Sequence, residues 1–242
     1  MNKTALLLFP LLIITFLSCN KNKQAPESEP VVPQEEKCLV TSISGNVGYG
    51  QSFTYDEQGR VILTTGRYFG TYSYSYSKDQ IITNTGSSIQ TYTLDQKGRI
   101  ITVVDSRSKR DYIYNADGYL INMNYYDVST GSQPVLNPGL SASYTYTDGN
   151  LTLIEQDSGN TKTTVEYNTL IAKDPFFTQM RNLPFPSTTI APMLVRYLGK
   201  QSKNLFDSSK NYVIDEKGNV KTAYQLVAGI SSGPANFGYN CK

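Results

Sequence analysis

A short pattern recurs along the chain and constrains its fold more than any other feature: three strand residues followed by Asp-x-x-Gly, with Asn115 in place of the Asp in one copy. Copies begin at Phe53, Tyr92, Tyr112 and Tyr212, a shorter copy begins at Tyr144, and a degenerate copy without the glycine begins at Tyr74. The first four copies start at positions 53, 74, 92 and 112, a period near 20. Self-similarity at a fixed spacing indicates that one supersecondary unit is repeated.

Each unit has the pattern of a β-hairpin. Aromatic and β-branched residues alternate with Ser, Thr and other polar residues, which is typical of strands. The Asp side chain can accept hydrogen bonds from backbone N–H groups ahead of it, and the glycine can take the positive φ that closes the turn. The predicted turn glycines are Gly59, Gly98, Gly118, Gly149 and Gly218. The sequence therefore predicts an all-β fold, an antiparallel meander of about a dozen strands that forms a strongly curved sheet or a partly open barrel.

The meander is interrupted near residues 174–199, where two short helices are expected. Asp174 and Pro175 are typical of a helix start, and Gly199 ends the second segment, which begins at Ile190. One interpretation is that the helices plug an open end or cover one face of the sheet. The other is that Phe176, Phe177, Phe185 and Tyr197 form the wall of a ligand cleft.

The N-terminal segment predicts export and lipid anchoring. Residues 1–18 combine Lys3 with an apolar run that is too short for a permanent membrane helix, as in a signal peptide. Phe16-Leu17-Ser18-Cys19 resembles a bacterial lipobox, in which the Cys is lipidated; an ordinary secretory signal is the alternative. Residues 19–37 then form a tether rich in Pro and Glu, extended or disordered, before a single β domain at 38–242. We expect a lipid-anchored protein of the cell envelope, in the outer membrane of a Gram-negative bacterium.

Cys38 and Cys241 lie at the two ends of the β domain. In an oxidising compartment two remaining Cys residues usually pair, so we predict a disulfide, with two free buried thiols as the alternative. Neither arrangement is catalytic, because no base is available to form a thiolate.

Composition excludes several kinds of chemistry. The chain contains no His, which removes Ser-His-Asp catalysis, Cys-His catalysis and His metal ligands. A formal charge of +2 provides no basic field for nucleic acid. Nearly every Asp belongs to a turn, and the remaining carboxylates, at Asp105, Asp111, Asp127, Glu155 and Glu166, show no spacing that suggests a catalytic pair. We therefore expect no enzyme activity, no metal and no cofactor.

The hairpin unit resembles the tyrosine-aspartate (YD) repeats of RHS-type shell proteins. The full layout, over roughly residues 50–226, is more similar to a family of exported bacterial lipoproteins of unknown function whose fold is described as porin-like. The Asp174-Pro175-Phe176-Phe177 insert and the Ser202-Lys203-Asn204-Leu205 return belong to that layout. The resemblance implies a fold and no chemistry.

Aromatic side chains are the most abundant candidate contact groups. Tyrosines such as Tyr72, Tyr74 and Tyr76 fill a concave core in one interpretation and line an aromatic groove in the other. The candidate ligand contacts are Tyr72, Tyr74, Tyr76, Phe176, Phe177 and Tyr197. The leading hypothesis is a non-enzymatic module that binds a protein, peptide or glycan of the envelope, or displays a surface to such a partner. The alternatives are a structural accessory subunit of an envelope assembly and a carboxylate-dependent polysaccharide hydrolase.

Overall fold

The computed structural model describes residues 38–45, 50–66, 70–128, 133–156, 161–164, 167–171, 192–206, 212–224 and 234–241. All of them belong to the unit formed by residues 36–242, and residues 1–35 form a separate unit. The signal peptide, Cys19, the tether, Glu166 and the helix expected from Asp174 onward, with Phe176 and Phe177, therefore lie outside the described residues.

The described residues form strands almost throughout. The strands are β1 (Cys38–Gly45), β2 (Gln51–Tyr55), β3 (Val61–Gly66), β4 (Gly70–Tyr76), β5 (Gln80–Asn84), β6 (Ile89–Leu94), β7 (Ile100–Val104), β8 (Ser108–Tyr114), β9 (Leu120–Asp127), β10 (Val135–Leu136), β11 (Ala142–Thr147), β12 (Asn150–Gln156), β13 (Thr161–Thr164), β14 (Tyr167–Ile171), β15 (Asn204–Phe206), β16 (Tyr212–Ile214), β17 (Val220–Tyr224) and β18 (Pro234–Cys241). Two 3-10 helices accompany them, η1 (Pro138–Leu140) and η2 (Pro192–Tyr197).

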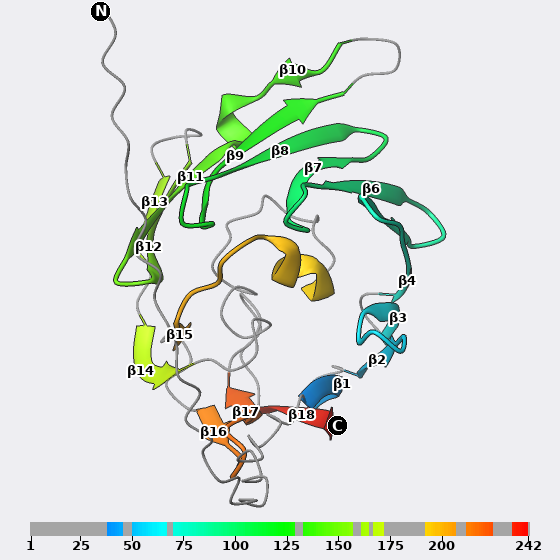
Figure 1. Cartoon of the computed structure of the whole chain (residues 1–242), viewed down its shortest axis with the longest axis vertical. Coiled ribbons are helices and arrows are strands. Elements are labelled where there is room, and N and C mark those ends of the chain that lie inside the picture. Colours follow the sequence, from blue (N-terminus) through cyan, green and yellow to red (C-terminus); the bar gives the residue numbers. More distant parts are fainter. Residues whose placement is uncertain are drawn as a thin grey trace, which may run out of the picture. The chain divides into compact units, whose positions relative to one another are not determined.

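Sixteen strands make one antiparallel sheet, and β14 pairs with β15 in a second, two-stranded sheet. The large sheet follows the order β13-β12-β11-β9-β8-β7-β6-β5-β4-β3-β2-β1-β18-β17-β16, with β10 beside β9. From β1 to β9 the spatial order is the chain order, which confirms the predicted meander, with more strands than expected. β13 and β16 are the two ends of this strand order, and among the described residues they do not pair with each other, so the sheet is not closed. From β1 to β9 the sheet follows a curve (Figure 1).

The first and last strands lie side by side. β1 pairs with β18 from Cys38↔Cys241 to Gly45↔Ala235, and the two cysteines at the start of this register form a disulfide. The predicted disulfide is therefore confirmed. It connects residues separated by 203 positions and fixes the two ends of the β domain to each other.

The predicted turns form as expected from their residues. Asp56 accepts hydrogen bonds at Oδ1 from the backbone N–H groups of Gln58 and Arg60, and Gly59 has a φ of 73°. The same positive φ occurs at Gly98, Gly118 and Gly218. The shorter copy makes the tighter turn, in which Asp148 and Gly149 both have positive φ (51° and 82°).

One face of the sheet is the core. The tyrosines that open the copies at 74, 92, 112 and 144 are buried and pack with aliphatic residues of neighbouring strands, whereas Tyr212 is partly buried. Residues between the tyrosines, such as Ser73 and Ser75 of β4, are exposed on the other face. η2 lies on the concave side of the curve, and its Leu194 joins this core (Figure 1). The second helix expected from the sequence is thus a short 3-10 helix, followed by Gly199 at a φ of 79°.

Candidate functional site

Four tyrosines, each two residues after a buried aromatic residue, connect their own strand to the neighbouring one. The Tyr76 hydroxyl donates to the Val61 carbonyl (2.7 Å), and the Tyr114 hydroxyl donates to the Ile100 carbonyl (2.6 Å). The same bond runs from Tyr55 to Val40, at 2.5 Å, and from Tyr239 to Val220, at 2.7 Å. These hydroxyls complete backbone hydrogen bonding across the sheet, which is a structural role.

The arginine after the turn glycine is held between two hairpins. The Arg99 guanidinium contacts Asp95 of its own turn (Nη2 to Oδ2, 2.6 Å) and lies 4.4 Å from the centre of the Tyr114 ring in the next hairpin. Burial alone would raise the pKa of Asp95, but hydrogen bonds from the Arg99 backbone and guanidinium lower that pKa below its ordinary value. The carboxylate therefore stays ionised and keeps Arg99 in place.

The structure brings four predicted contact residues together without exposing them as a free aromatic groove. Tyr74 is only 6% exposed, and its hydroxyl accepts a hydrogen bond from Thr64 (3.2 Å). Tyr72 and Tyr76 are partly buried against the core, and the Tyr197 ring on η2 lies 6.4 Å from that of Tyr76. Burial raises the pKa of Tyr74, Tyr76 and Tyr197, so these phenols are neutral at physiological pH. Phe176 and Phe177 lie outside the described residues.

The carboxylates that were not assigned to turns have partners on the sheet. Asp105 pairs with the buried Arg110 (3.0 Å), Asp111 pairs with Lys109 (2.8 Å), and Glu155 pairs with Lys162 (2.6 Å). Asp127 accepts a hydrogen bond from the Asn137 amide, at 2.7 Å. Within the described ranges, no group of three or more His, Cys, Asp or Glu residues could hold a metal ion, and no helix is long and apolar enough to span a membrane.

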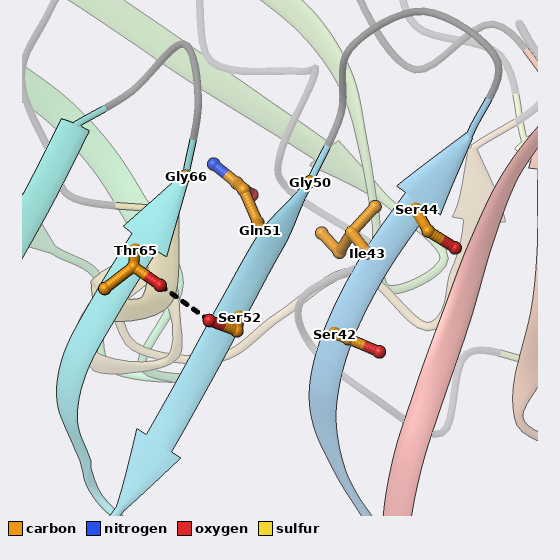
Figure 2. Close-up of a pocket in the computed structure, with 8 residues that line it drawn as sticks. All are labelled: Ser42, Ile43, Ser44, Gly50, Gln51, Ser52, Thr65 and Gly66. Carbon is orange, nitrogen blue, oxygen red and sulfur yellow. Dashed lines mark hydrogen bonds between the residues drawn. The ribbon is translucent and has the colours of Figure 1, made fainter.

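A pocket of about 490 Å³ lies between the ends of the first three strands (Figure 2). Its lining combines hydroxyl groups, one amide, one aliphatic side chain and backbone: Ser42, Ile43, Ser44, Gly50, Gln51, Ser52, Thr65 and Gly66. β1 and β2 share only the register pairs Ser42↔Ser52 and Ile43↔Gln51 among the described residues, and the pocket lies where this short ladder ends.

The geometry of this pocket follows from its strands. Gly66 pairs with Gln51, and a Cβ at position 66 would lie 2.9 Å from Cγ of Gln51 and 3.1 Å from the Gly50 carbonyl, so only glycine fits without displacement. On the next pair, the Ser52 and Thr65 hydroxyls lie 2.6 Å apart (Figure 2). Ile43 is 7% exposed and belongs to the hydrophobic core. None of the six side chains among the described lining residues is titratable, so these residues can donate and accept hydrogen bonds but supply no acid or base.

Sequence reasoning did not find this pocket. Its residues come from three strands, and serine, threonine and glutamine are ordinary residues for the polar positions of a sheet. Only the short β1–β2 ladder, a property of the tertiary structure, turns these positions into a concave site.

Comparisons with known proteins agree with the architecture. No protein-family model matches the chain, and no curated protein matches its sequence. Among solved structures, a porin-like protein from Bacteroides uniformis ATCC 8492 is similar over 88% of this chain and 99% of its own, with a TM-score of 0.52 and 16% sequence identity. The fold is porin-like. At this identity the likeness concerns the fold alone.

Proposed function

We propose that this protein is a non-enzymatic binding module of the bacterial cell envelope. It binds a neutral ligand rich in hydroxyl or amide groups, a class that includes glycans and peptide segments, in the pocket at the ends of β1, β2 and β3. The lipid on Cys19 holds the β domain at the outer membrane, and residues 20–37 are the tether.

The composition of the pocket carries this proposal. The pocket is an open depression of about 490 Å³ rather than an enclosed cavity, so its lining can contact one side of a ligand. The Ser42, Ser52 and Thr65 hydroxyls lie on one face of the strands and Gln51 on the other, so a ligand between the strand ends can exchange hydrogen bonds with hydroxyls and with the amide. Because the lining contains no carboxylate, amine, thiol or phenol, these groups favour binding over catalysis.

Export is supported by separate observations. Disulfides persist in oxidising compartments, and the Cys38–Cys241 bridge is typical of an exported protein. The porin-like fold of the solved neighbour is consistent with an envelope protein. The lipid anchor itself depends on the sequence at Phe16–Cys19.

An accessory role in an envelope assembly is the second candidate, favoured by apolar residues on the outer face. Ile82 and Val104 are 38% and 42% exposed, and both pair with Thr91, so the three lie in one row across β5, β6 and β7. Two exposed aliphatic side chains in one cross-strand row fit a protein contact.

Site-specific photo-crosslinking in intact cells separates the two candidates. A crosslinker at Ser44, in the pocket, should capture a glycan or peptide, whereas one at Ser87, exposed in the β5–β6 turn, serves as the matched control. A third crosslinker, at Val104, tests the exposed aliphatic row. If it captures one reproducible protein while the crosslinker at Ser44 captures nothing, the accessory role is favoured and ligand binding in the pocket is contradicted.

A further inference from the structure

A second pocket, of about 340 Å³, lies where three segments meet: the β6–β7 turn, the β8–β9 turn and the chain that follows η2. Four of its lining side chains are cationic, Lys97, Arg99, Arg196 and Lys200, whereas Asp117 is its one lining carboxylate. The whole chain has a formal charge of only +2, so this is a local concentration of positive charge rather than a general property of the surface.

Arg99 is held in a fixed orientation at this pocket. Its Nε and Nη2 contact Asp95 (2.8 and 2.6 Å), and its guanidinium lies 4.4 Å from the centre of the Tyr114 ring. The remaining nitrogen, Nη1, lies beside Gly118, 3.9 Å from where a Cβ of that residue would be. One edge of the guanidinium is therefore directed to the pocket wall while the other edge is occupied.

The chain after η2 is fixed against the same turn. The Lys200 backbone N–H donates to the Gly118 carbonyl (2.8 Å), and the Lys200 Nζ lies 4.7 Å from the centre of the Tyr119 ring. Gly199 permits this approach, because a Cβ there would lie 2.4 Å from the Gly118 carbonyl oxygen. The backbone that carries Lys200 and Arg196 is thus positioned by contacts with the hairpins.

The charges of this pocket are not balanced. Within the described part of the chain no carboxylate pairs with Lys97, Arg196 or Lys200, although five other ion pairs form there. Asp117 in the wall and Asp95 behind Arg99 offset two of the four cations, which leaves two positive charges facing a common space. Cations gathered in this way repel one another, and a bound anion with several oxygens would relieve that repulsion.

We propose that this pocket binds the phosphate group of a phosphate-bearing ligand. Arg99, Lys97, Arg196 and Lys200 contact its oxygens, and a volume of about 340 Å³ leaves room for the part of the ligand that carries the phosphate. This second site goes beyond the proposed function, since it lies in other elements and selects charge, whereas the hydroxyl-lined pocket selects neutral groups. The phosphate can belong to a soluble metabolite or to a lipid headgroup.

The test is calorimetric titration of the full, lipidated chain in neutral detergent with two probes, inorganic phosphate and a short-chain phosphatidylglycerol. The test variant carries Lys97→Gln and Lys200→Gln. The control variant carries Lys217→Gln and Lys203→Gln. It loses the same net charge as the test variant, and its two lysines lie at positions that correspond to Lys97 and Lys200 in other turns. Lys217 follows Asp215 in a turn as Lys97 follows Asp95, and the Lys203 N–H donates to the Gly149 carbonyl as that of Lys200 donates to Gly118.

At least one probe should bind the unaltered protein and the control variant alike, and its affinity for the test variant should be at least about tenfold lower. Tighter binding of inorganic phosphate identifies a soluble ligand, and tighter binding of phosphatidylglycerol identifies a lipid headgroup. Binding should also weaken as salt concentration rises. Absence of binding by both probes, or an equal loss in the two variants, would overturn the proposal; neither result bears on the hydroxyl-lined pocket.

Discussion

Arg60, at the end of the first repeated turn, lies with its guanidinium 4.5 Å from the centre of the Tyr76 ring in the next hairpin. Asp56 holds the other side of the same guanidinium at 2.7 Å from Nε. Arg99 repeats the arrangement with Asp95 and Tyr114. At these two turns the arginine therefore connects the turn to the strand that opens the next copy, which gives the spacing near 20 residues a physical basis there.

Replacing Arg60 by Met should lower the free energy of unfolding by about 1 kcal/mol, because a cation–π contact at a half-exposed site is lost. The measurement is denaturant unfolding of Arg60→Met, Tyr76→Leu and the double variant. A coupling energy of about 0.5–1 kcal/mol between the two changes is expected. If the losses of the two single variants simply add in the double variant, the contact between Arg60 and Tyr76 does not stabilise the fold.

The tyrosine hydroxyl bonds should be measurable one at a time. Tyr76→Phe and Tyr114→Phe each leave a backbone carbonyl without its partner, so each should reduce stability by about 1 kcal/mol. Tyr126→Phe is the matched control on the outer face, where Tyr126 pairs with Lys109 and its ring contacts that amine. A control loss as large as that of the core tyrosines would argue against the hydroxyl bonds.

Two glycines with the same backbone conformation should respond differently to alanine. Gly86 and Gly199 have φ values of 82° and 79°, but a Cβ at 86 meets nothing within 4 Å, whereas one at 199 meets the Gly118 carbonyl at 2.4 Å. Gly86→Ala should destabilise by about 1 kcal/mol from the left-handed backbone alone. Gly199→Ala should destabilise by about 3 kcal/mol, because overpacking adds to that strain. Thermal unfolding of both variants compares the two effects, and equal losses would show that the η2 segment does not approach the turn closely.

The disulfide should contribute to stability through the connection of β1 to β18. Replacing Cys38 and Cys241 by Ser should lower the free energy of unfolding by about 2–5 kcal/mol. Reductant should destabilise the unaltered protein by a similar amount and leave the double Ser variant unchanged. If reductant also lowers the free energy of unfolding of the double Ser variant, its effect on the unaltered protein does not come from the Cys38–Cys241 disulfide alone.

Alkaline pH should unfold the β domain. Burial raises the pKa of Tyr74, Tyr76, Tyr112, Tyr114 and Tyr144 above the ordinary value of 10.0. These groups stay protonated in the folded state while the unfolded chain ionises, so their contribution is complete below pH 10 and is lost as pH rises above it. Tyrosinate absorbance and circular dichroism should then change together in one transition above pH 10. Ionisation of all tyrosines with the dichroism unchanged would contradict the burial.

The sequence by itself determined the local structure of this protein. Alternation and the Asp-x-x-Gly chemistry act over a few consecutive residues, so the strands and the hairpin turns could be predicted. The segment before Gly199 is expected to be helical but forms only a short 3-10 helix, Pro192–Tyr197, and the sequence leaves open the choice between a tyrosine core and a tyrosine groove. The Cys38–Cys241 pair could be predicted as well, because the chain has three cysteines and Cys19 is assigned to the lipid anchor.

The tertiary structure decided the contacts between copies. Which carbonyl receives the Tyr76 hydroxyl, and which ring receives Arg60, depend on the spatial order of hairpins and on strand register. The same holds for both pockets. Ser42, Gln51 and Thr65 form one because three strands end together there, and Lys97 meets Lys200 only because the chain after η2 returns to the β8–β9 turn. Interactions between residues distant in the chain are set by how the strands are paired and curved, and no local pattern encodes them.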